Sequence, residues 1–402
     1  MASSDKKKIM ILGAGPFQMA AIQKAVSMGL HVITVDYLPD NIGHQLGHQY
    51  VNCSTVDKVG IERAARENAV DGICTFSSDV AIPSVAAVCD RLHLPGPTQV
   101  AAETMANKQR FRAFLSGAGL PCPRFVAGRN FTEVTDALSQ LHLPMIVKPV
   151  DTSGSRGVSR IDSKNLQLVE RAFEKAKTFS HTNTVCVEEF IDGIEVGGDA
   201  ILLDGHVAFI AITHKHLDQF VVTGHNLPTN ISPEDQNRVT QAIEATCNSL
   251  NYDTGPLNFD VIVSPTTVTI LEMSGRNGGN GIPAVIERAT GVDVERATIS
   301  LALGLSPTLP EQVNIRQGAG SFVFGVGCHG VLESLTPNAA LRRQVPEIFD
   351  LCYIKQPGDR VEPFEHNGQL IGFALFDCLS SSEYERLTAH ILDHLKLAVR
   401  CD

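Results

Sequence analysis

Several features that would place a chain in a specialised class of protein are lacking from this sequence. There is no run of like charge, no long serine, glutamine or glycine tract, and no internal repeat. Lys and Arg number 33 against 44 Asp and Glu, which gives a formal net charge of −11. Because there is no basic excess, no general field attracts nucleic acid or an anionic membrane, and we expect neither as a partner. With 43% hydrophobic and 19% charged residues, the composition is that of a soluble globular enzyme.

The ten cysteines contain no CxxC pair, and no secretion signal precedes them. The apolar stretch near the N-terminus is only about six residues long before it meets Gly13, so it predicts a first strand, neither a leader nor a membrane span. Scattered cysteines without a signal indicate reduced thiols in a cytoplasmic protein.

A chain of 402 residues exceeds what one hydrophobic core usually covers, so several packed units are expected. Short apolar runs alternate with helical stretches over residues 1–105, which predicts a doubly wound parallel α/β domain. A small α+β lobe is expected at 106–190, a larger lobe at 191–305 and a mixed, β-rich segment at 306–402. The predicted strands lie within 8–15, 31–37, 71–78, 145–150, 184–191, 198–214, 257–274, 320–327 and 370–377, and the predicted helices at 17–28, 59–68, 107–119, 166–177, 233–251, 292–303 and 381–397.

The first predicted strand ends in a glycine turn, Gly13-Ala14-Gly15-Pro16-Phe17-Gln18. The turn resembles a dinucleotide fingerprint in which Gln18 replaces the third glycine, and Asp36 ends the next strand, where an acid would meet a ribose. The missing glycine favours the plainer interpretation, in which the turn only joins a strand tightly to a helix.

A second candidate phosphate site begins at Lys148, at the end of an apolar run. A Walker loop has its lysine after the glycines, whereas Lys148 precedes them, which excludes that fold. The lysine and the serine- and glycine-rich loop after it still provide a positive charge and backbone N–H groups for a triphosphate. A plain surface hairpin is the alternative.

Acidic residues follow in two groups. Glu188 and Glu189 end a predicted strand and Glu195 begins the next, so their backbone could meet a planar base and a carboxylate could meet a ribose, unless these acids simply face water. Asp260 and Glu272 lie on two strands joined by a turn at 264–267, and a hairpin would bring the two acids side by side. Paired carboxylates suit Mg²⁺ bound together with substrate phosphates. Arg276 and Asn277 follow, and the arginine could stabilise a transferring phosphoryl group.

With these motifs in this order, the chain resembles the ATP-grasp superfamily over essentially its whole length, and within it the carboxylate–amine ligases. The resemblance implies an ATP-grasp fold: the N-terminal α/β domain, a two-lobed ATP-binding region and a small C-terminal β-rich segment. It implies ATP as cosubstrate with one or two Mg²⁺ ions, or Mn²⁺, held by Asp260 and Glu272. Catalytic roles would fall to Lys148 and Arg276. The implied ATP-binding residues are Lys108, Lys148, Ser153, Gly154, Ser155, Gly157, Val158, Glu188, Glu189, Phe190, Ile191 and Glu195.

One position departs from the family. Ser274 stands where the family usually has a metal-binding Asn, which leaves a second metal to Asn277 or to water. A hydroxyl is a poorer Mg²⁺ ligand than an amide oxygen.

The ligase resemblance also implies where the substrates bind. Family members activate a carboxylate as an acyl phosphate that an amine then attacks, so the partners would be a small carboxylate and a small amine. Substrate contacts are expected from His225, Arg276, Asn277, Gly278 and Gly279, although His225 could be a loop histidine without a task and the glycines could merely permit a turn. A homodimer is suggested by family analogy alone.

Other functions stay open at the level of sequence. A purine-pathway ATP-grasp enzyme, similar to carboxyaminoimidazole ribonucleotide synthase or glycinamide ribonucleotide synthetase, would need a substrate-phosphate site, and only Arg342-Arg343 forms a further basic pair. An NAD(P)-dependent dehydrogenase would leave Lys148 and the Asp260–Glu272 pair without a role. A non-catalytic nucleotide sensor would bind ATP without turnover.

Overall fold

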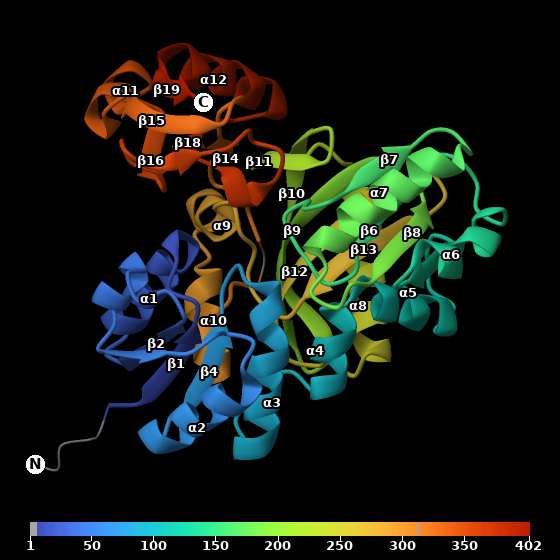
Figure 1. Ribbon diagram of the computed structural model, residues 1–402. Helices are drawn as coiled ribbons and strands as arrows, with labels where there is room; N and C mark the ends of the chain where they lie inside the picture. The colour runs from blue at the N-terminus through green and yellow to red at the C-terminus, as the bar shows by residue number, and fades with distance from the viewer. Residues whose placement is uncertain (1–5, 312) are drawn as a thin grey trace, which may run out of the picture.

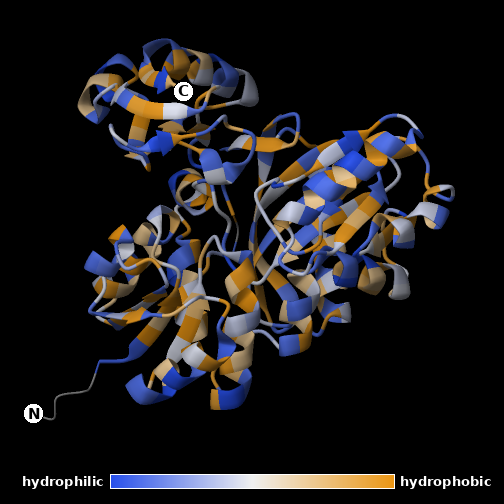
Figure 2. Cartoon of the chain, in the orientation of Figure 1, coloured by the Kyte–Doolittle hydropathy of each residue, from blue (hydrophilic) through white to orange (hydrophobic). Residues whose placement is uncertain are grey.

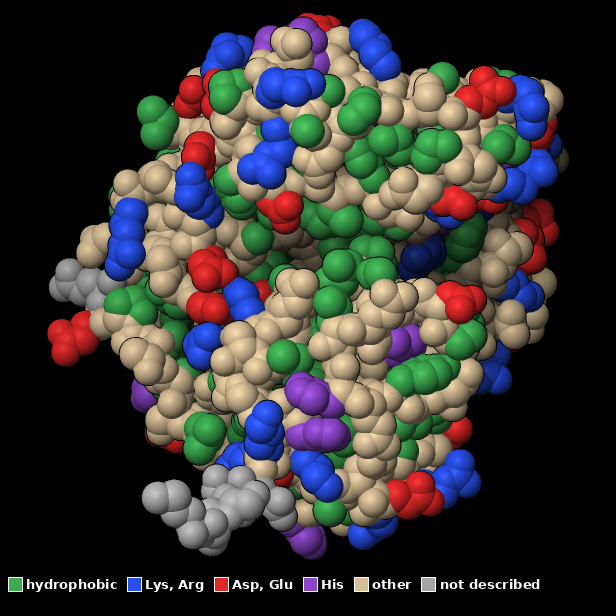
Figure 3. Space-filling model, turned by 90° about the vertical axis from the view of Figure 1, so that its left-hand side faces the viewer, with side chains coloured by type: hydrophobic (Ala, Val, Ile, Leu, Met, Phe, Trp, Pro, Cys, Tyr) green, Lys and Arg blue, Asp and Glu red, His purple; other side chains and the backbone are tan. Residues whose placement is uncertain are grey.

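The computed structural model describes residues 6–311 and 313–402. The strands form four hydrogen-bonded sheets (Figure 1). None of the helices in these two ranges is both long and apolar enough to span a bilayer. On the face in Figure 3 the surface is hollowed between its upper and lower parts, and hydrophobic and basic side chains are visible inside the hollow.

The N-terminal sheet is entirely parallel, in the order β3-β2-β1-β4. Its strands are β1 (Lys8–Leu12), β2 (His31–Asp36), β3 (Gln49–Asn52) and β4 (Gly72–Thr75). Helices α2 (Lys58–Asn68) and α3 (Ile82–Leu92) cover one face, while α1 (Met19–Ser27) and the distant α10 (Val294–Ala302) cover the other. Burial on both faces explains why β1, β2 and β4 are nearly continuous apolar runs (Figure 2).

A second sheet is antiparallel, in the order β5-β8-β6-β7. Its strands are β5 (Phe125–Gly128), β6 (Met145–Pro149), β7 (Ser159–Ile161) and β8 (Val185–Glu189). Helices α6 (Phe131–Leu138) and α7 (Leu166–Phe179) share a core with it, built around Val147, Val169 and Phe173. Helices α4 (Gln99–Met105) and α5 (Lys108–Gly117) lead into this region.

The largest sheet is also antiparallel, in the order β13-β12-β9-β10-β11-β14-β18-β16. It starts with β9 (Ile194–Leu203), β10 (His206–Asp218), β11 (Val221–Leu227), β12 (Gly255–Val263) and β13 (Val268–Ser274). The strands β14 (Ala319–Phe324), β16 (Ile348–Tyr353) and β18 (Gly372–Asp377) extend it. Helix α8 (Pro233–Ser249) packs near β12 and β13, and α9 (Ile282–Thr290) packs near β14. The C-terminal segment therefore continues the sheet that carries Asp260 and Glu272.

The rest of the C-terminal segment forms a smaller layer over β14, β16 and β18 (Figure 1). It contains the sheet β17-β15-β19, with β15 (Gly330–Leu335), β17 (Arg360–Val361) and β19 (Leu397–Cys401), and the helices α11 (Asn338–Gln344) and α12 (Ser381–His394). Single 3₁₀ turns occur at Pro16–Gln18, Ile42–Gln45, Asp79–Ala81 and Asn367–Gln369.

The predicted parallel α/β layer and the predicted hairpin after Asp260 are both confirmed. Sequence reasoning missed the short or glycine-interrupted elements, including β3, β5, β7, β11 and α9. The alternative interpretation of His225 as a loop histidine is wrong, because residues 221–227 form an interior strand of the large sheet. The four-part division of the chain at residues 105, 190 and 305 stays a prediction.

The close approach of α12 to the large sheet gives a stability prediction at Gly224 in β11. A Cβ atom there would lie 1.9 Å from Tyr384 Oη and 2.0 Å from the Ser321 carbonyl oxygen. We expect Gly224→Ala to lower the free energy of unfolding by about 3 kcal/mol, because a backbone atom must shift to make room. Gly117→Ala is the matched control: it lies in α5 with open space around the new methyl group, and should be neutral or raise stability by about 0.5 kcal/mol. Urea unfolding followed by circular dichroism measures both, and equal effects would contradict the steric explanation.

Candidate active site

A cavity of about 870 Å³ lies between the β5-β8-β6-β7 sheet and the β12–β13 hairpin. Every residue predicted to bind ATP or metal lines it except Gly157; the lining members of that set are Lys108, Lys148, Ser153, Gly154, Ser155, Val158, Glu188, Glu189, Phe190, Ile191, Glu195, Asp260 and Glu272. The structure thus brings together side chains that lie up to 164 residues apart, from Lys108 to Glu272.

Gly157 instead shapes the loop that follows Lys148. Its φ is +70°, and a Cβ atom would lie 2.8 Å from the Phe179 ring. The loop is tied down at two further points: Ser155 Oγ donates to the Phe220 carbonyl at 2.5 Å, and the Asn367 N–H donates to the Gly154 carbonyl at 3.2 Å. The candidate phosphate loop is therefore held against the β10–β11 turn and the C-terminal segment.

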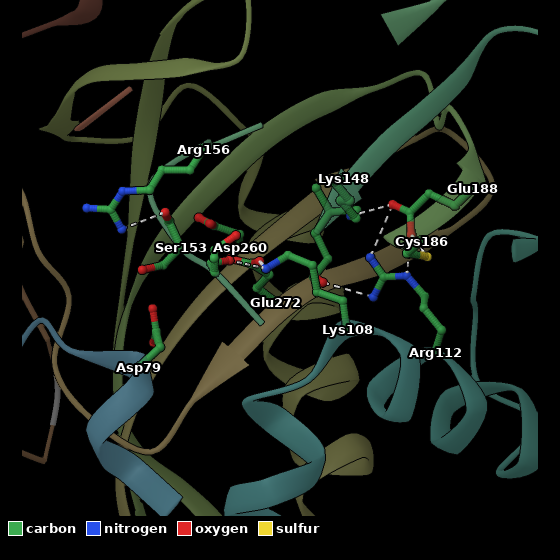
Figure 4. A network of polar contacts seen from close by, with 12 residues as sticks. Asp79, Lys108, Arg112, Lys148, Ser153, Arg156, Cys186, Glu188, Asp260 and Glu272 are labelled. Carbon is green, nitrogen blue, oxygen red and sulfur yellow. Dashed lines mark hydrogen bonds and ion pairs between the residues drawn. The ribbon is translucent and has the colours of Figure 1, made fainter. Parts of the chain in front are cut away.

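Lys148 belongs to a buried network of charges (Figure 4). Its Nζ donates to Glu188 Oε1 at 2.6 Å, and Glu188 also accepts from Arg112 Nε at 2.9 Å and from Arg112 Nη2 at 3.3 Å. Burial alone would raise the pKa of Glu188, but Arg112 and Lys148 outweigh it and hold the pKa at about 2. Arg112 is fully buried and its remaining terminal nitrogen donates to the Leu271 carbonyl at 2.9 Å. Glu188 therefore holds Lys148 in place and is itself held by α5.

Lys108 starts α5 four residues before Arg112, so both side chains leave the same face of the helix. Its Nζ forms an ion pair with Glu272 and donates to the Thr152 carbonyl at 2.7 Å. Burial opposes both charges, yet each partner stabilises the other, so the pKa of Lys108 is raised and that of Glu272 is lowered.

Asp260 and Glu272 are directly opposite each other in the β12–β13 pairing. Asp260 Oδ1 lies 2.9 Å from Lys215 Nζ, and Glu195 Oε1 lies 2.6 Å from the same nitrogen. Burial raises the pKa of Asp260 in spite of Lys215. Two hard carboxylates side by side on one wall of the cavity are a donor set that fits Mg²⁺ together with substrate phosphates.

Arg276 is held by the N-terminal part of the chain. Its Nε and Nη2 donate to Asp79 Oδ1 at 2.9 and 2.5 Å, and its Nη1 donates to the Asn277 carbonyl at 2.9 Å. Burial would raise the pKa of Asp79, but Arg276 lowers it overall. Arg276 and Asp79 line a small cavity that shares Lys108, Thr152, Ser153 and Glu272 with the first one.

Residues 277–279 are anchored by a second buried carboxylate, Asp199 in β9. The N–H of Gly278 donates to Asp199 Oδ1 at 2.8 Å, and Asn277 Nδ2 donates to Oδ2 at 3.3 Å. A Cβ atom on Gly278 would lie 2.8 Å from Asn258 Nδ2, so this close packing requires glycine. Burial raises the pKa of Asp199 to about 6 against these hydrogen bonds. The Asn277 side chain is fully buried, and its amide oxygen accepts a hydrogen bond from Thr298 Oγ1 at 2.6 Å. Gly279, in contrast, has space around its Cα atom.

His225 lies in β11 opposite Lys215 and is almost fully buried. Thr213 Oγ1 donates to the Gly197 carbonyl at 3.0 Å and lies 2.9 Å from His225 Nδ1. Because the hydroxyl hydrogen goes to the carbonyl, Nδ1 must be the donor, which leaves Nε2 as an acceptor. Burial, reinforced by Lys215, lowers the pKa of His225 well below its usual value, so the ring is neutral.

The N-terminal glycine turn is occupied by contacts within the protein. The Asp36 carboxylate accepts from the N–H groups of Ala14 at 3.2 Å and Leu38 at 3.0 Å. Gln18 Nε2 donates to the Phe76 carbonyl at 2.6 Å. These contacts support the interpretation of this turn as a strand-to-helix connection.

Four residues of these networks were missed from the sequence: Asp79, Arg112, Asp199 and Lys215. Arg112 carried a weak signal, its four-residue spacing from Lys108. The other three have no local motif, because their partners lie on distant strands.

Comparison with known proteins identifies a family match in the part of the chain that contains most of this site. Residues 141–284 match a family model described as an ATP-grasp domain. Human carnosine synthase 1 is 24% identical over 97% of this chain and 52% of its own length, so the chain spans about half the length of that relative.

Two solved structures cover nearly the whole fold. The L-amino acid ligase from Bacillus licheniformis superposes with a TM-score of 0.83 at 21% identity, covering 98% of this chain and 99% of that one. Phosphoribosylglycinamide synthetase from Anaerococcus prevotii gives a TM-score of 0.77 at 21% identity, covering 98% and 100%. At such identity these similarities establish the fold.

The charge network around Glu188 predicts an acid-sensitive stability. Its pKa of about 2 in the folded protein lies below the ordinary value of 4.5, so its contribution is fully present above pH 4.5 and is lost as the pH falls toward 2. We expect Glu188→Gln to lower the free energy of unfolding at pH 7 by about 3 kcal/mol, because Arg112 loses its buried partner. Below pH 4.5 the difference in the free energy of unfolding between the variant and the wild type should become smaller.

Urea titrations at pH 7, 5 and 3.5 measure this dependence. Glu67→Gln, at an exposed position in α2, is the matched control and should match the wild type at every pH. A gap for Glu188→Gln that stays constant across the three pH values would contradict the assignment.

Proposed function

The chain belongs to the ATP-grasp superfamily of ATP-dependent ligases, and we propose that it joins a carboxylate to an amine through an acyl phosphate, releasing ADP and phosphate. The observation that carries this proposal is that the two cavities adjoin and share lining residues. The larger one holds the two lysines, the serine–glycine loop and the paired carboxylates, and the smaller one holds Arg276, with Lys108, Ser153 and Glu272 common to both. Arg276 therefore lies beside the cavity in which the triphosphate is proposed to bind.

In the proposed complex, Lys108 and Lys148 hold the α- and β-phosphates of ATP. An ammonium group has three donors, so each lysine can keep its carboxylate partner while it also binds a phosphate oxygen. The loop of residues 153–158 covers the triphosphate, residues 188–191 meet the adenine and Glu195 meets the ribose. Arg160 stacks over the Phe190 ring, 4.4 Å from its centre, which stiffens the adenine side of the cavity.

The proposed metal ligands are Asp260 and Glu272. When bound, Mg²⁺ or Mn²⁺ would neutralise phosphate charge and orient the γ-phosphoryl group. Lys215 keeps Asp260 charge-compensated and Lys108 does the same for Glu272, so the carboxylates are positioned before any ligand arrives.

The substrate carboxylate is proposed to attack the γ-phosphorus, with ADP leaving, and the amine then attacks the acyl carbon as phosphate leaves. Arg276 lies where it can stabilise the charge on the phosphoryl oxygens during both steps. The free lone pair on His225 Nε2 is proposed to accept a hydrogen bond from the amine, and Gly279 is proposed to contact the substrate, whereas the backbone N–H and carbonyl of Gly278 are occupied by Asp199 and Ser77. Among family reactions, amino acids are the proposed substrates, in line with the L-amino acid ligase and carnosine synthase similarities.

A purine-pathway reaction is the second candidate, favoured by the similarity to phosphoribosylglycinamide synthetase. That chemistry requires a cation cluster for a ribosyl phosphate. Arg342 does not provide it, because its guanidinium donates to the carbonyls of Ile348 and Phe349 on the outer layer.

The deciding experiment is to measure ADP, AMP, phosphate and pyrophosphate released from ATP and Mg²⁺ with pools of amino acids, small carboxylic acids and ribosyl phosphate amines. ADP and phosphate that appear only with a particular acid and amine would support the ligase and name its substrates. AMP and pyrophosphate would overturn the acyl-phosphate mechanism, dependence on a ribosyl phosphate amine would favour the purine reaction, and nucleotide binding without turnover in any pool would favour a sensor.

Loss of a phosphate-site lysine should stop the reaction without unfolding the protein. We expect Lys148→Ala to lower turnover at least about 100-fold while the fold survives, because Glu188 keeps Arg112 as partner. Glu272→Ala should have the same effect on turnover. Lys175→Ala, on the exposed face of α7, is the matched control. Normal ATP-dependent activity in Lys148→Ala would remove the assignment.

Arg276→Ala tests the transition-state role. We expect kcat to fall by about 100-fold or more with a smaller change in KM, because the charge on the phosphoryl group is greatest in the transition state. Steady-state kinetics with the identified substrates separate the two constants. A change in KM alone would make Arg276 a substrate anchor.

A further inference from the structure

Asn258 and Ser274 form a second side-chain pair next to Asp260 and Glu272. The two residues are opposite each other in the β12–β13 pairing, one step from the Asp260–Glu272 pair along the same face of the hairpin. Asn258, Glu272 and Ser274 all line the small cavity that also contains Lys108 and Arg276. One face of the hairpin therefore presents a carboxamide, two carboxylates and a hydroxyl to the two adjoining cavities.

The orientation of the Asn258 amide is fixed by its partners. Its Nδ2 lies 2.9 Å from the Gly198 carbonyl oxygen and 3.0 Å from Asp199 Oδ1. Both partners can only accept, so the amino end must face them and the amide oxygen must face the other way. Within residues 6–311 and 313–402 no group donates a hydrogen bond to that oxygen.

The other side-chain oxygen atoms near Glu272 that could bind a metal ion already have partners within the protein. The Asn277 amide oxygen accepts from Thr298 and is fully buried. Asp79 is paired with Arg276, and the Ser274 hydroxyl lies close enough to the Asp79 carboxylate to help lower its pKa. Among the described residues on this face, the Asn258 amide oxygen is thus the uncharged oxygen that is free to bind a metal ion.

We propose that Asn258 is a ligand of a divalent cation, and that its amide oxygen would hold, together with Glu272, the ion that accompanies the nucleotide. This role would account for a serine at position 274, since the amide comes from the facing strand of the same hairpin. Asp199 acts as a positioning residue, because it turns the Asn258 oxygen outward and anchors Gly278 at the same time. The inference rests on the proposed assignment of Glu272 as a metal ligand.

Binding of Mn²⁺ by the full-length chain tests the inference without any turnover. Free Mn²⁺ is titrated by electron paramagnetic resonance at saturating ADP, for the wild type, Asn258→Ser and Ser274→Ala. The hydroxyl introduced by Asn258→Ser can still donate to Gly198 or Asp199, but the amide oxygen is lost. Thermal melting and ADP affinity establish that each variant is folded and binds nucleotide.

We expect Asn258→Ser to weaken Mn²⁺ binding at least tenfold at unchanged ADP affinity, and Ser274→Ala to match the wild type. Wild-type Mn²⁺ affinity in Asn258→Ser overturns the role of Asn258, and so does a loss confined to Ser274→Ala. If Asn258→Ser does not fold, Asn258→Gln, which moves the amide oxygen by one methylene, replaces it with the same expectation. A wild type that binds no Mn²⁺ with ADP overturns the Glu272 assignment itself, whereas failure to find ligase substrates leaves this measurement untouched.

Discussion

The arrangement of the site depends on one constraint: a buried cation must be matched by a buried anion. Lys148 and Arg112 share Glu188, Lys108 meets Glu272, Lys215 lies between Glu195 and Asp260, and Arg276 meets Asp79. Because each pair joins different elements, the constraint also positions the elements. Arg112 ties α5 to β8, and Arg276 ties the end of β13 to the turn that follows β4.

This matching separates residues that can act on a ligand from residues that hold others in place. Arg112 is fully buried and directs its guanidinium to Glu188 and the Leu271 carbonyl, so it can only position. Lys148 uses one of three donors on Glu188 and faces the cavity, so it can bind. The same reasoning distinguishes Asp199, whose oxygens are occupied by N–H groups inside the protein, from Asp260 and Glu272 on the cavity wall.

The ligand-facing residues could be predicted from the sequence, whereas the residues that position them could not. The Asp260–Glu272 pairing was predictable because a short turn joins the two strands, and the Lys148 loop was predictable because its residue types are contiguous. The partners that hold them were not. Arg112 meets Glu188 across 76 residues and Asp79 meets Arg276 across 197, and no local pattern encodes such pairs. Strand β11 was not predicted because glycine and asparagine in its sequence are typical of loops, whereas its pairing with β10 and β14 overrides that tendency.

The N-terminal sheet contributes to the site through such long-range contacts. Its glycine turn suggests a nucleotide site, yet Gln18 in that turn donates a hydrogen bond to the Phe76 carbonyl. Phe76 and Ser77 directly follow β4. The Ser77 N–H donates to the Asn277 carbonyl at 3.1 Å, and its Oγ donates to the Gly278 carbonyl at 3.0 Å. With Asp79 on Arg276, three successive contacts connect the end of a parallel strand to the proposed substrate segment. An α/β sheet places its functional residues at the carboxyl ends of its strands, and here that edge serves to position a loop that belongs to a different sheet.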